Sequence, residues 1–301
     1  MWSDIKPLAS FEYFAPTSVA EVLNLLSRFG EKGRLLAGGT DLIPQMRLRT
    51  KCPEVIIDLR KVRELCYVVN EDYYIRIGSR TTLTEIVNSE CVKVRIPVLA
   101  EAINQLGCIE IRNRATIGGN LCNASPSADT APALLVLDAS VKLMTVEGEK
   151  IVPLSGFFLG PGKTIMKPWE LMTEITIPVS DRKATFLKFG RRSGFTLSLI
   201  SVAASLRIQG NVLRDVRVAM GAAAPTPVRC QRVEASLEGQ IVSKEVIEKA
   251  ALVAKEEVNP AREKESSSRY RRASDEYRRE MAYLFVKRVL KKLTEGDEYD
   301  D

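Results

Sequence analysis

The sequence predicts an α+β protein divided into two domains. Its 301 residues, 45% hydrophobic and 27% charged, are more than a single compact core usually contains. Strand-like and helix-like segments both recur along the chain, and the strand pattern starts again after the polar segment 178–183 (PVSDRK). We therefore expect a first domain over residues 1–178, a second over 184–292 and an acidic tail over 293–301.

The first half alternates helices with short strands. Residues 18–30 (SVAEVLNLLSRFG) predict a helix that begins with a capping box of Ser18 and Glu21 and ends at glycine. Residues 55–59 predict a buried strand, and 65–70 with 73–78 predict a hairpin. A second capping box, Thr82 with Glu85, opens another helix. Residues 97–107 run from proline to glycine, which is typical of a complete helix.

The second half is expected to contain strands over 140–148, 170–178, 185–190 and 212–224. Helices are expected over 197–206 (LSLISVAASL), over 243–258 and in the last long segment, where Met281, Leu284, Phe285 and Val289 share one face. The segment 272–280 (RASDEYRRE) pairs opposite charges at helical spacing. A solvated helix face is favoured for it, and a subunit contact is the alternative. The acidic tail is expected to lack structure.

Composition excludes several kinds of site. The chain has no histidine, which excludes Ser-His-Asp, Cys-His and histidine-ligated metal chemistry. It also excludes a histidine-linked flavin, so any flavin is expected to be bound non-covalently. The six cysteines form no CxxC pair, so we expect reduced thiols in a cytoplasmic protein without a metal site. No apolar run approaches the roughly 18 residues of a membrane span.

The net charge of +6 favours anionic partners. Lys and Arg are spread along the chain and aromatic residues make up only 6%, whereas nucleic-acid-binding surfaces concentrate basic groups and add aromatic stacking. A mixed surface with attraction for an anionic cofactor is therefore favoured. A basic nucleic-acid-binding protein without a cofactor is the alternative from another class.

Two glycine pairs carry the candidate chemistry. In 35–43 (LLAGGTDLI), Gly38 and Gly39 permit a nest of backbone amides around an anion. A tight turn is the simpler interpretation of this pair alone, and neither a P-loop nor a Rossmann fingerprint occurs. The second glycine-bearing turn, 116–129 (TIGGNLCNASPSAD), adds hydrogen-bonding side chains, and Asp129 can accept from sugar hydroxyls. A polar surface loop is its alternative interpretation. Two such segments together favour one dinucleotide ligand.

These segments resemble the medium, FAD-binding subunits of molybdenum hydroxylases, the family of xanthine dehydrogenases and aerobic carbon monoxide dehydrogenases. The matching segments, in order, are FEYFAPTSVAEVL, LLAGGTDLI, VIIDLRKV, IGSRTTLTEI, IRNRATIGGNLCNASPSADTAPALLVLDA, TEITIP and RASDEYRRE. The resemblance implies a two-lobed FAD-binding domain of the vanillyl-alcohol oxidase type and a smaller α+β C-terminal domain. It covers almost the whole chain.

The resemblance also implies the site residues. The first loop would place Leu35, Leu36, Ala37, Gly38, Gly39, Thr40, Asp41 and Leu42 around the diphosphate. The rest of the diphosphate, the ribityl chain and the adenosine side would be lined by Thr116, Gly118, Gly119, Asn120, Cys122, Ser125 and Asp129. Leu171 and Met172 would lie beside the flavin. Lys188 would approach its pyrimidine edge, where a cation tunes the cofactor.

The function that the resemblance implies is electron transfer. Electrons would pass from a large molybdenum-cofactor subunit, through iron-sulfur clusters on a small subunit, to FAD on this chain and then to an external acceptor. No side chain of this chain need act as an acid or base on the substrate. The alternative is a free-standing FAD-dependent reductase or oxidase of the same fold, for which no substrate segment is found.

The sequence departs from some relatives at two places. Leu106 stands where several of them have an aromatic residue over the flavin ring, and no cysteine-rich insertion for an extra cluster is present. We therefore expect the flavin to be the only redox centre of this chain.

Overall fold

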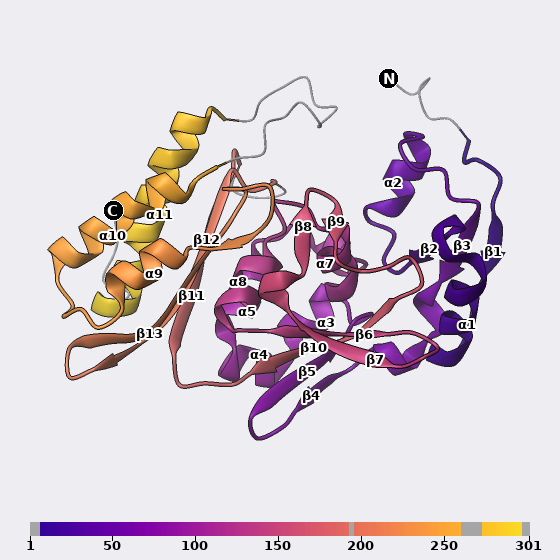
Figure 1. The fold of residues 1–301 in the computed structure, drawn as a ribbon, viewed down its shortest axis with the longest axis horizontal. Coiled ribbons are helices and arrows are strands. Elements are labelled where there is room, and N and C mark those ends of the chain that lie inside the picture. Colours follow the sequence, from indigo (N-terminus) through magenta and orange to yellow (C-terminus); the bar gives the residue numbers. More distant parts are fainter. Residues whose placement is uncertain (1–6, 193–195, 260–272, 297–301) are drawn as a thin grey trace.

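The computed structural model describes residues 7–192, 196–259 and 273–296. They form three consecutive parts, which Figure 1 shows along the long axis from the indigo N-terminal lobe to the orange and yellow C-terminal helices. Each part is built around its own hydrophobic cluster. The predicted α+β fold class, with two lobes followed by a further α+β domain, is confirmed.

The N-terminal lobe is a small parallel sheet with one covering helix. Its strands pair in the order β1 (Glu12–Phe14), β3 (Val55–Asp58), β2 (Gly33–Leu36), and α1 (Val19–Phe29) packs its buried side chains onto them. Ser18 caps α1 as predicted, because its Oγ accepts from the Glu21 amide at 3.2 Å. The predicted capping box is only half formed, since the Glu21 carboxylate accepts from the Thr17 amide instead.

The second lobe is an antiparallel sheet with helices packed on one face. The sheet order is β4 (Val68–Asn70), β5 (Tyr74–Gly78), β10 (Leu171–Pro178), β6 (Ser140–Met144), β7 (Glu149–Pro153). The helices are α3 (Leu83–Asn88), α4 (Glu90–Arg95), α5 (Pro97–Asn104), α6 (Ile109–Arg112), α7 (Ile117–Asn123) and α8 (Thr130–Val136). The predicted hairpin, the Thr82–Glu85 capping box and the proline at the start of α5 are all confirmed.

Two further short strands, β8 (Phe158–Gly160) and β9 (Lys163–Thr164), form a separate ribbon beside α7. The amide of Gly162 in its turn donates to the Ala124 carbonyl at 3.0 Å, which fixes the ribbon to the end of α7.

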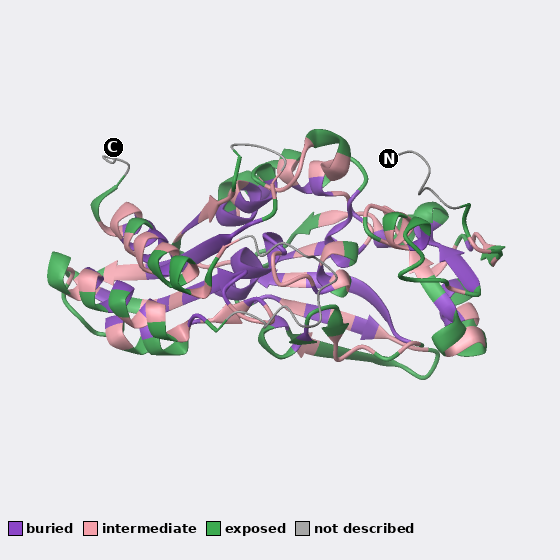
Figure 2. Ribbon diagram, turned by 90° about the horizontal axis from the view of Figure 1, so that it is seen from above, coloured by how far each residue is buried: buried purple, intermediate pink, exposed green. Residues whose placement is uncertain are grey.

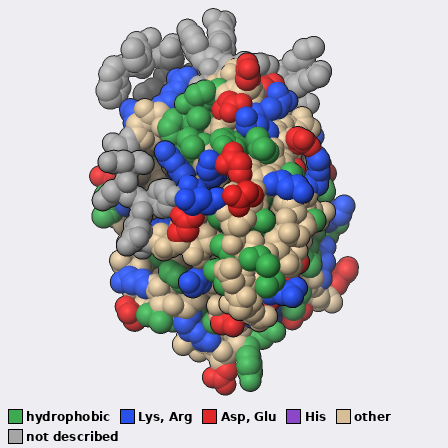
Figure 3. Space-filling model, turned by 90° about the vertical axis from the view of Figure 1, so that its left-hand side faces the viewer, with side chains coloured by type: hydrophobic (Ala, Val, Ile, Leu, Met, Phe, Trp, Pro, Cys, Tyr) green, Lys and Arg blue, Asp and Glu red, His purple; other side chains and the backbone are tan. Residues whose placement is uncertain are grey.

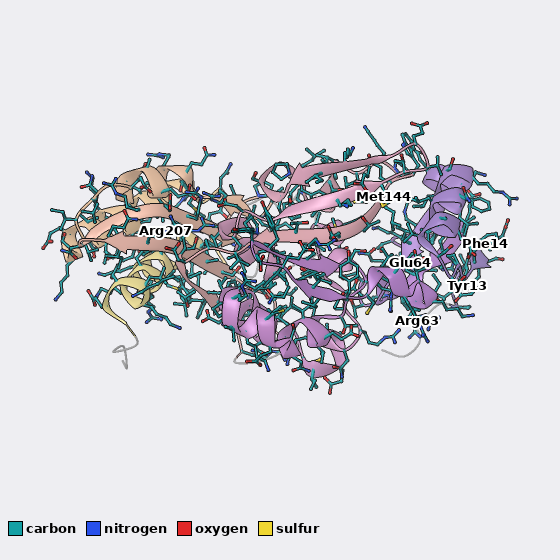
Figure 4. The ribbon with its side chains drawn as sticks, turned by 90° about the horizontal axis from the view of Figure 1, so that it is seen from below. Tyr13, Phe14, Arg63, Glu64, Met144 and Arg207 are labelled. Atoms are coloured by element: carbon teal, nitrogen blue, oxygen red, sulfur yellow. The ribbon has the colours of Figure 1, made fainter. Side chains whose placement is uncertain are left out.

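Side chains from both lobes join at their boundary. Met144 and Leu171, from the second lobe, pack against the cluster of the N-terminal lobe. Figure 4 shows Tyr13, Phe14 and Glu64 at the N-terminal end and Met144 on the sheet of the second lobe, at its side toward that end. The Tyr13 hydroxyl donates to the buried Asp58 carboxylate at 2.5 Å, and Glu64 accepts from the first amide of α1 at 2.8 Å. These two bonds lie within the N-terminal lobe and tie β1 and α1 to the chain that includes and follows β3.

The C-terminal domain is a second antiparallel sheet, ordered β11 (Lys183–Phe189), β12 (Ile200–Gln209), β13 (Val212–Gly221), β14 (Val228–Arg229). One face packs on α9 (Gln231–Leu237), α10 (Lys244–Glu257) and α11 (Asp275–Glu295). The other face packs on α5 and α8 of the second lobe, and Phe186, Ala203 and Ala219 join the second lobe's core. The sheet is therefore buried on both sides.

The predicted helix over 197–206 is wrong, because residues 200–209 form strand β12. Ile200, Val202, Ala204 and Leu206 point to the C-terminal helices. The intervening positions are small, and the Ser205 hydroxyl donates to a carbonyl of α8 at 2.8 Å. A strand buried on both faces shows no polar alternation, so its pattern resembles that of a buried helix.

Helix α11 is fixed to the sheet by a charged residue. Arg278 donates to the Leu199 and Ala222 carbonyls at 2.8 and 2.9 Å, so the expectation of a simply solvated face for 272–280 is wrong at this position. Lys255 of α10 pairs with Glu280 at 2.8 Å. The acidic tail beyond residue 296, and Arg272, lie outside the described residues.

Arg207 secures the connection between the two sheets. From β12 it pairs with Asp181, in the connection after β10, at 2.5 Å and with Asp215 at 2.6 Å, and Figure 4 shows it in the C-terminal sheet. Figure 2 shows buried residues along the interior strands and exposed residues on the outer helices. Within the described ranges, no helix combines the length and hydropathy that a membrane span requires.

Candidate functional site

A cavity of about 780 Å³ is lined by both lobes and by the C-terminal domain. Its size lies within the range of cofactor pockets, roughly 300–1,000 Å³. The wall combines backbone and polar groups of the two glycine segments with apolar side chains such as Leu106, Ile111 and Leu199. Such a mixed wall suits a ligand with one anionic and one flat apolar part.

The first glycine segment supplies backbone donors. Residues 38–41 connect β2 to α2 (Leu42–Arg47) and line the cavity. Their amides donate to no other group within the described residues, whereas the Ile43 amide, two positions further on, donates to the Gly39 carbonyl at 3.2 Å. Gly39 has φ +79°, which favours glycine. Buried or partly buried amides require partners, so this segment supports the predicted anion nest.

The second glycine segment has a different structure from the one expected. It is the first turn of helix α7, capped by Thr116, and not a glycine turn. The Ile117 and Gly118 amides donate to the Thr81 and Ser79 carbonyls at 3.1 and 2.9 Å, and the Gly119 amide donates to the Thr116 Oγ1 at 3.1 Å. These amides are therefore occupied. The segment contributes side chains and closely packed backbone to the cavity, and it does not supply a second set of backbone amide donors.

Close packing places the first glycine segment against the chain that leads into the second. A Cβ atom on Gly38 would lie 2.0 Å from the Arg114 carbonyl oxygen, and one on Gly119 would lie 4.0 Å from the Ala37 Cβ. A Cβ atom on Gly118 would lie 2.7 Å from the Ser79 carbonyl oxygen. Gly38 and Gly118 are therefore required for packing, and Gly119 is the glycine with more room around it.

All but two of the predicted site residues line this cavity. The exceptions are Leu36 and Lys188. The lining residues that were predicted are Leu35, Ala37, Gly38, Gly39, Thr40, Asp41, Leu42, Thr116, Gly118, Gly119, Asn120, Cys122, Ser125, Asp129, Leu171 and Met172. The structure thus brings together segments that are far apart in the sequence.

Several lining residues were not predicted. They include Arg34, Gln45, Lys51, Ser79, Met166, Pro168, Arg191, Arg192 and Leu197. These residues lack a local signal, because folding alone brings them to the cavity. Asn123, one of the hydrogen-bonding side chains of the 116–129 segment, also lines the cavity.

Charged groups near the first loop influence one another. Burial raises the pKa of the Asp41 carboxyl, and the nearby Lys51 ammonium partly opposes this rise. Burial and the neighbouring Arg34 lower the pKa of Lys51. Arg34 and Lys51 both line the cavity, so this part of the wall carries positive charge that favours an anionic group.

A buried polar cluster lies beside the cavity. The Lys188 Nζ donates to the Asp129 carboxylate at 2.6 Å and to the Gln105 carbonyl at 2.9 Å. The Ser198 hydroxyl donates to the other Asp129 oxygen. Burial raises the pKa of Asp129, while Lys188 and Ser198 oppose this rise. The carboxylate expected to accept from a sugar is therefore already bonded to two side chains.

Cys122 lines the cavity with its sulfur 3.5 Å from the Met166 sulfur. The residue as a whole is exposed, and it forms part of the cavity wall. Burial raises the pKa of Cys122 to about 12, so the group is a neutral thiol at physiological pH. Among the described residues, no cluster of acidic or cysteine side chains has metal-binding geometry.

The residues present fit FAD. The amides at 38–41, which have no acceptor among the residues that the structure describes, and the positive charge of Arg34 and Lys51 suit a diphosphate. Leu106, Leu171 and Met172 supply apolar surface for a flat ring. The cavity, its donors and its apolar wall together define a dinucleotide-binding flavoprotein.

Family models agree with this class. Residues 9–180 match the FAD binding domain in molybdopterin dehydrogenase, and residues 185–293 match the CO dehydrogenase flavoprotein C-terminal domain. The chain therefore belongs to the family of FAD-binding medium subunits of molybdenum hydroxylases, as the resemblance predicted.

Similar proteins span nearly the same length. The carbon monoxide dehydrogenase medium chain of Hydrogenophaga pseudoflava is 34% identical over 84% of this chain and 88% of its own. The xanthine dehydrogenase FAD-binding subunit of Escherichia coli O157:H7 is 31% identical over 82% of this chain and 86% of its own. The solved carbon monoxide dehydrogenase of H. pseudoflava matches with a TM-score of 0.91 and 32% identity, covering 97% of this chain and 99% of its own. These relatives are flavin subunits of molybdenum hydroxylase complexes, so the chain is an oxidoreductase subunit of this type.

Proposed function

We propose that this chain holds one FAD non-covalently in the cavity and transfers electrons between subunits of a molybdenum hydroxylase and an external acceptor. The observation that carries the proposal is the row of amides at residues 38–41, which donate to no group in the described part of the chain, in a cavity that also has an apolar wall. Bound FAD would accept electrons from one-electron donors and pass them on to the acceptor. The division into a FAD-binding region, 1–178, and a C-terminal domain, 184–292, is part of this proposal.

The first loop would hold the diphosphate through its amides and the Thr40 hydroxyl. The Asn120 Oδ1 accepts from the Thr130 hydroxyl at 2.6 Å, and its Nδ2 group, which donates to no acceptor among the described residues, could donate to the cofactor. Leu171 and Met172 would pack on the ring and exclude water from it. These residues bind and orient the cofactor, and none of them acts as an acid or base on the substrate.

Hydroxylation would take place elsewhere in a complex. The relatives are named as medium chains or FAD-binding subunits, which supports partners of other kinds: a small iron-sulfur subunit and a large molybdenum-cofactor subunit. All six cysteines are unpaired, which suits a reducing compartment such as the cytoplasm.

Purification from the native source tests this proposal. We expect this chain to co-elute with two other subunits and the complex to contain flavin, iron and molybdenum. A chain that purifies alone, contains FAD and reduces or oxidises a small substrate by itself would instead support a free-standing reductase or oxidase. A colourless protein that binds oligonucleotides with steep salt dependence would support the nucleic-acid alternative.

The surface charge does not favour that alternative. Figure 3 shows acidic and basic side chains interspersed on the end of the molecule that it draws, without a surface of one sign.

A further inference from the structure

The ion pair between Asp129 and Lys188 connects the two halves of the molecule. Asp129 precedes α8 in the second lobe, and Lys188 belongs to β11 of the C-terminal sheet. Their side chains are 4% and 5% exposed, and the two charged groups are 2.6 Å apart. A buried ion pair contributes little net stability, whereas loss of one partner leaves a costly unpaired charge.

The position of this pair suggests a role beyond packing. Asp129 lines the cavity, and Lys188 lies one layer behind it, bonded to the Gln105 carbonyl just before the lining residues Leu106 and Gly107. Because the surroundings are buried, a charge here acts on a cavity ligand with little screening. The pair, however, carries no net charge.

We propose that Asp129 is a positioning residue that neutralises and orients Lys188 behind the flavin wall, with Ser198 holding the carboxylate in place. This inference rests on the proposed function, since it concerns the reduction potential of the bound flavin. It differs from the expected role of Asp129 as an acceptor for the cofactor's sugar hydroxyls. The observation behind it is that both carboxylate oxygens are already engaged, one by Lys188 and one by Ser198.

The test is the reduction potential of bound FAD in Asp129→Asn, measured against a reference dye. The substitution keeps the side-chain shape and removes the compensating negative charge. A positive charge near the ring stabilises the negative charge that flavin gains on reduction. We therefore expect the reduction equilibrium to shift about tenfold towards reduction, equivalent to about 30 mV for a two-electron couple. The double variant Asp129→Asn with Lys188→Met removes both charges and should return the potential close to that of the wild type.

Ser198→Ala provides a milder test that does not remove a buried charge. It should shift the potential in the same direction by a smaller amount, and it remains informative if Asp129→Asn does not fold. Thr185→Val is the matched control. The Thr185 hydroxyl also links β11 to the second lobe, by donating to Glu101 at 2.9 Å, yet neither residue lines the cavity. The reduction potential of FAD in this control variant should equal that in the wild type.

The outcomes separate this inference from the proposed function. Wild-type protein without FAD would contradict the proposed function itself. Wild-type protein that binds FAD, together with Asp129→Asn and Ser198→Ala variants of unchanged potential, would overturn the inference alone. So would an Asp129→Asn variant that folds but loses FAD, because that result would make Asp129 a direct ligand. If the reduction potential of the double variant differed from that of the wild type as much as the potential of Asp129→Asn does, charge compensation would be overturned.

Discussion

Gly38 lies directly against the Arg114 backbone, so that a Cβ atom at position 38 would be 2.0 Å from the Arg114 carbonyl oxygen. This contact holds the first glycine loop on the chain that leads into α7. The sequence suggests glycine there for the backbone conformation of an amide nest, whereas the structure shows that glycine is needed for packing of the protein on itself. The amides of the loop still line the cavity.

Gly38→Ala should therefore damage both the fold and FAD binding. We expect the free energy of unfolding to fall by about 1–3 kcal/mol, as for other overpacked sites, and FAD to be lost with the displaced loop. Chemical denaturation and flavin absorbance measure the two effects. Gly156→Ala is the control, since a Cβ atom there meets nothing within 4 Å. Equal stability of the two variants would contradict the packing role.

Gly119→Val should separate binding from stability. A Cβ atom at this position approaches only the Thr116 hydroxyl, at 2.8 Å, and the Ala37 side chain, at 4.0 Å. Disturbing the Thr116 cap costs about 1 kcal/mol, while the added methyl groups narrow the cavity. We expect FAD affinity to fall at least tenfold, about 1.4 kcal/mol, measured by fluorescence titration. An affinity equal to that of the wild type would remove Gly119 from the site.

Cys122 should report occupancy of the cavity. Because the pKa of Cys122 is raised to about 12, the reactive thiolate is scarce at pH 7–8 and its fraction rises about tenfold per pH unit below that value. Alkylation mapped by mass spectrometry should therefore be slow at Cys122, faster at higher pH and blocked by FAD. The exposed Cys52 serves as the internal control. Alkylation of Cys122 at the same rate with and without FAD would contradict this location of the cofactor.

Lys188→Ala should leave FAD bound and lower its reduction potential, with an effect that depends on pH. Burial raises the pKa of Asp129, and removal of Lys188 removes a group that opposes this rise. Above that pKa the unpaired carboxylate is negative and disfavours reduction, and below it the neutral carboxyl does not. The difference in reduction potential between the variant and the wild type should thus grow as pH rises, when potentials are measured at several pH values. A difference in potential that shrinks with rising pH would contradict the proposed effect of the Asp129 carboxylate on the flavin.

Local patterns predicted several single elements. The Ser18 and Thr82 caps, the 65–78 hairpin and the proline at the start of α5 each depend on neighbouring residues, so the sequence alone was sufficient. Strand β12 could not be recognised in this way, because its burial on both faces comes from helices that are distant in the sequence.

The candidate site was predictable where a motif carried it. The glycine segments identified one wall of the cavity, and the family resemblance added Leu171 and Met172. Arg34, Lys51 and Met166 were missed because only tertiary packing brings them to that wall. The occupied amides of α7 were also missed, since a glycine pair does not distinguish a ligand nest from a helix start.

The most direct test of the account is titration of the flavin-free protein with FAD, followed by calorimetry and repeated with FMN. We expect one FAD per chain, with FMN binding at least tenfold more weakly because it lacks the adenylate and the diphosphate bridge that the amides of residues 38–41 would hold. Absence of saturable FAD binding by folded protein would contradict the central claim.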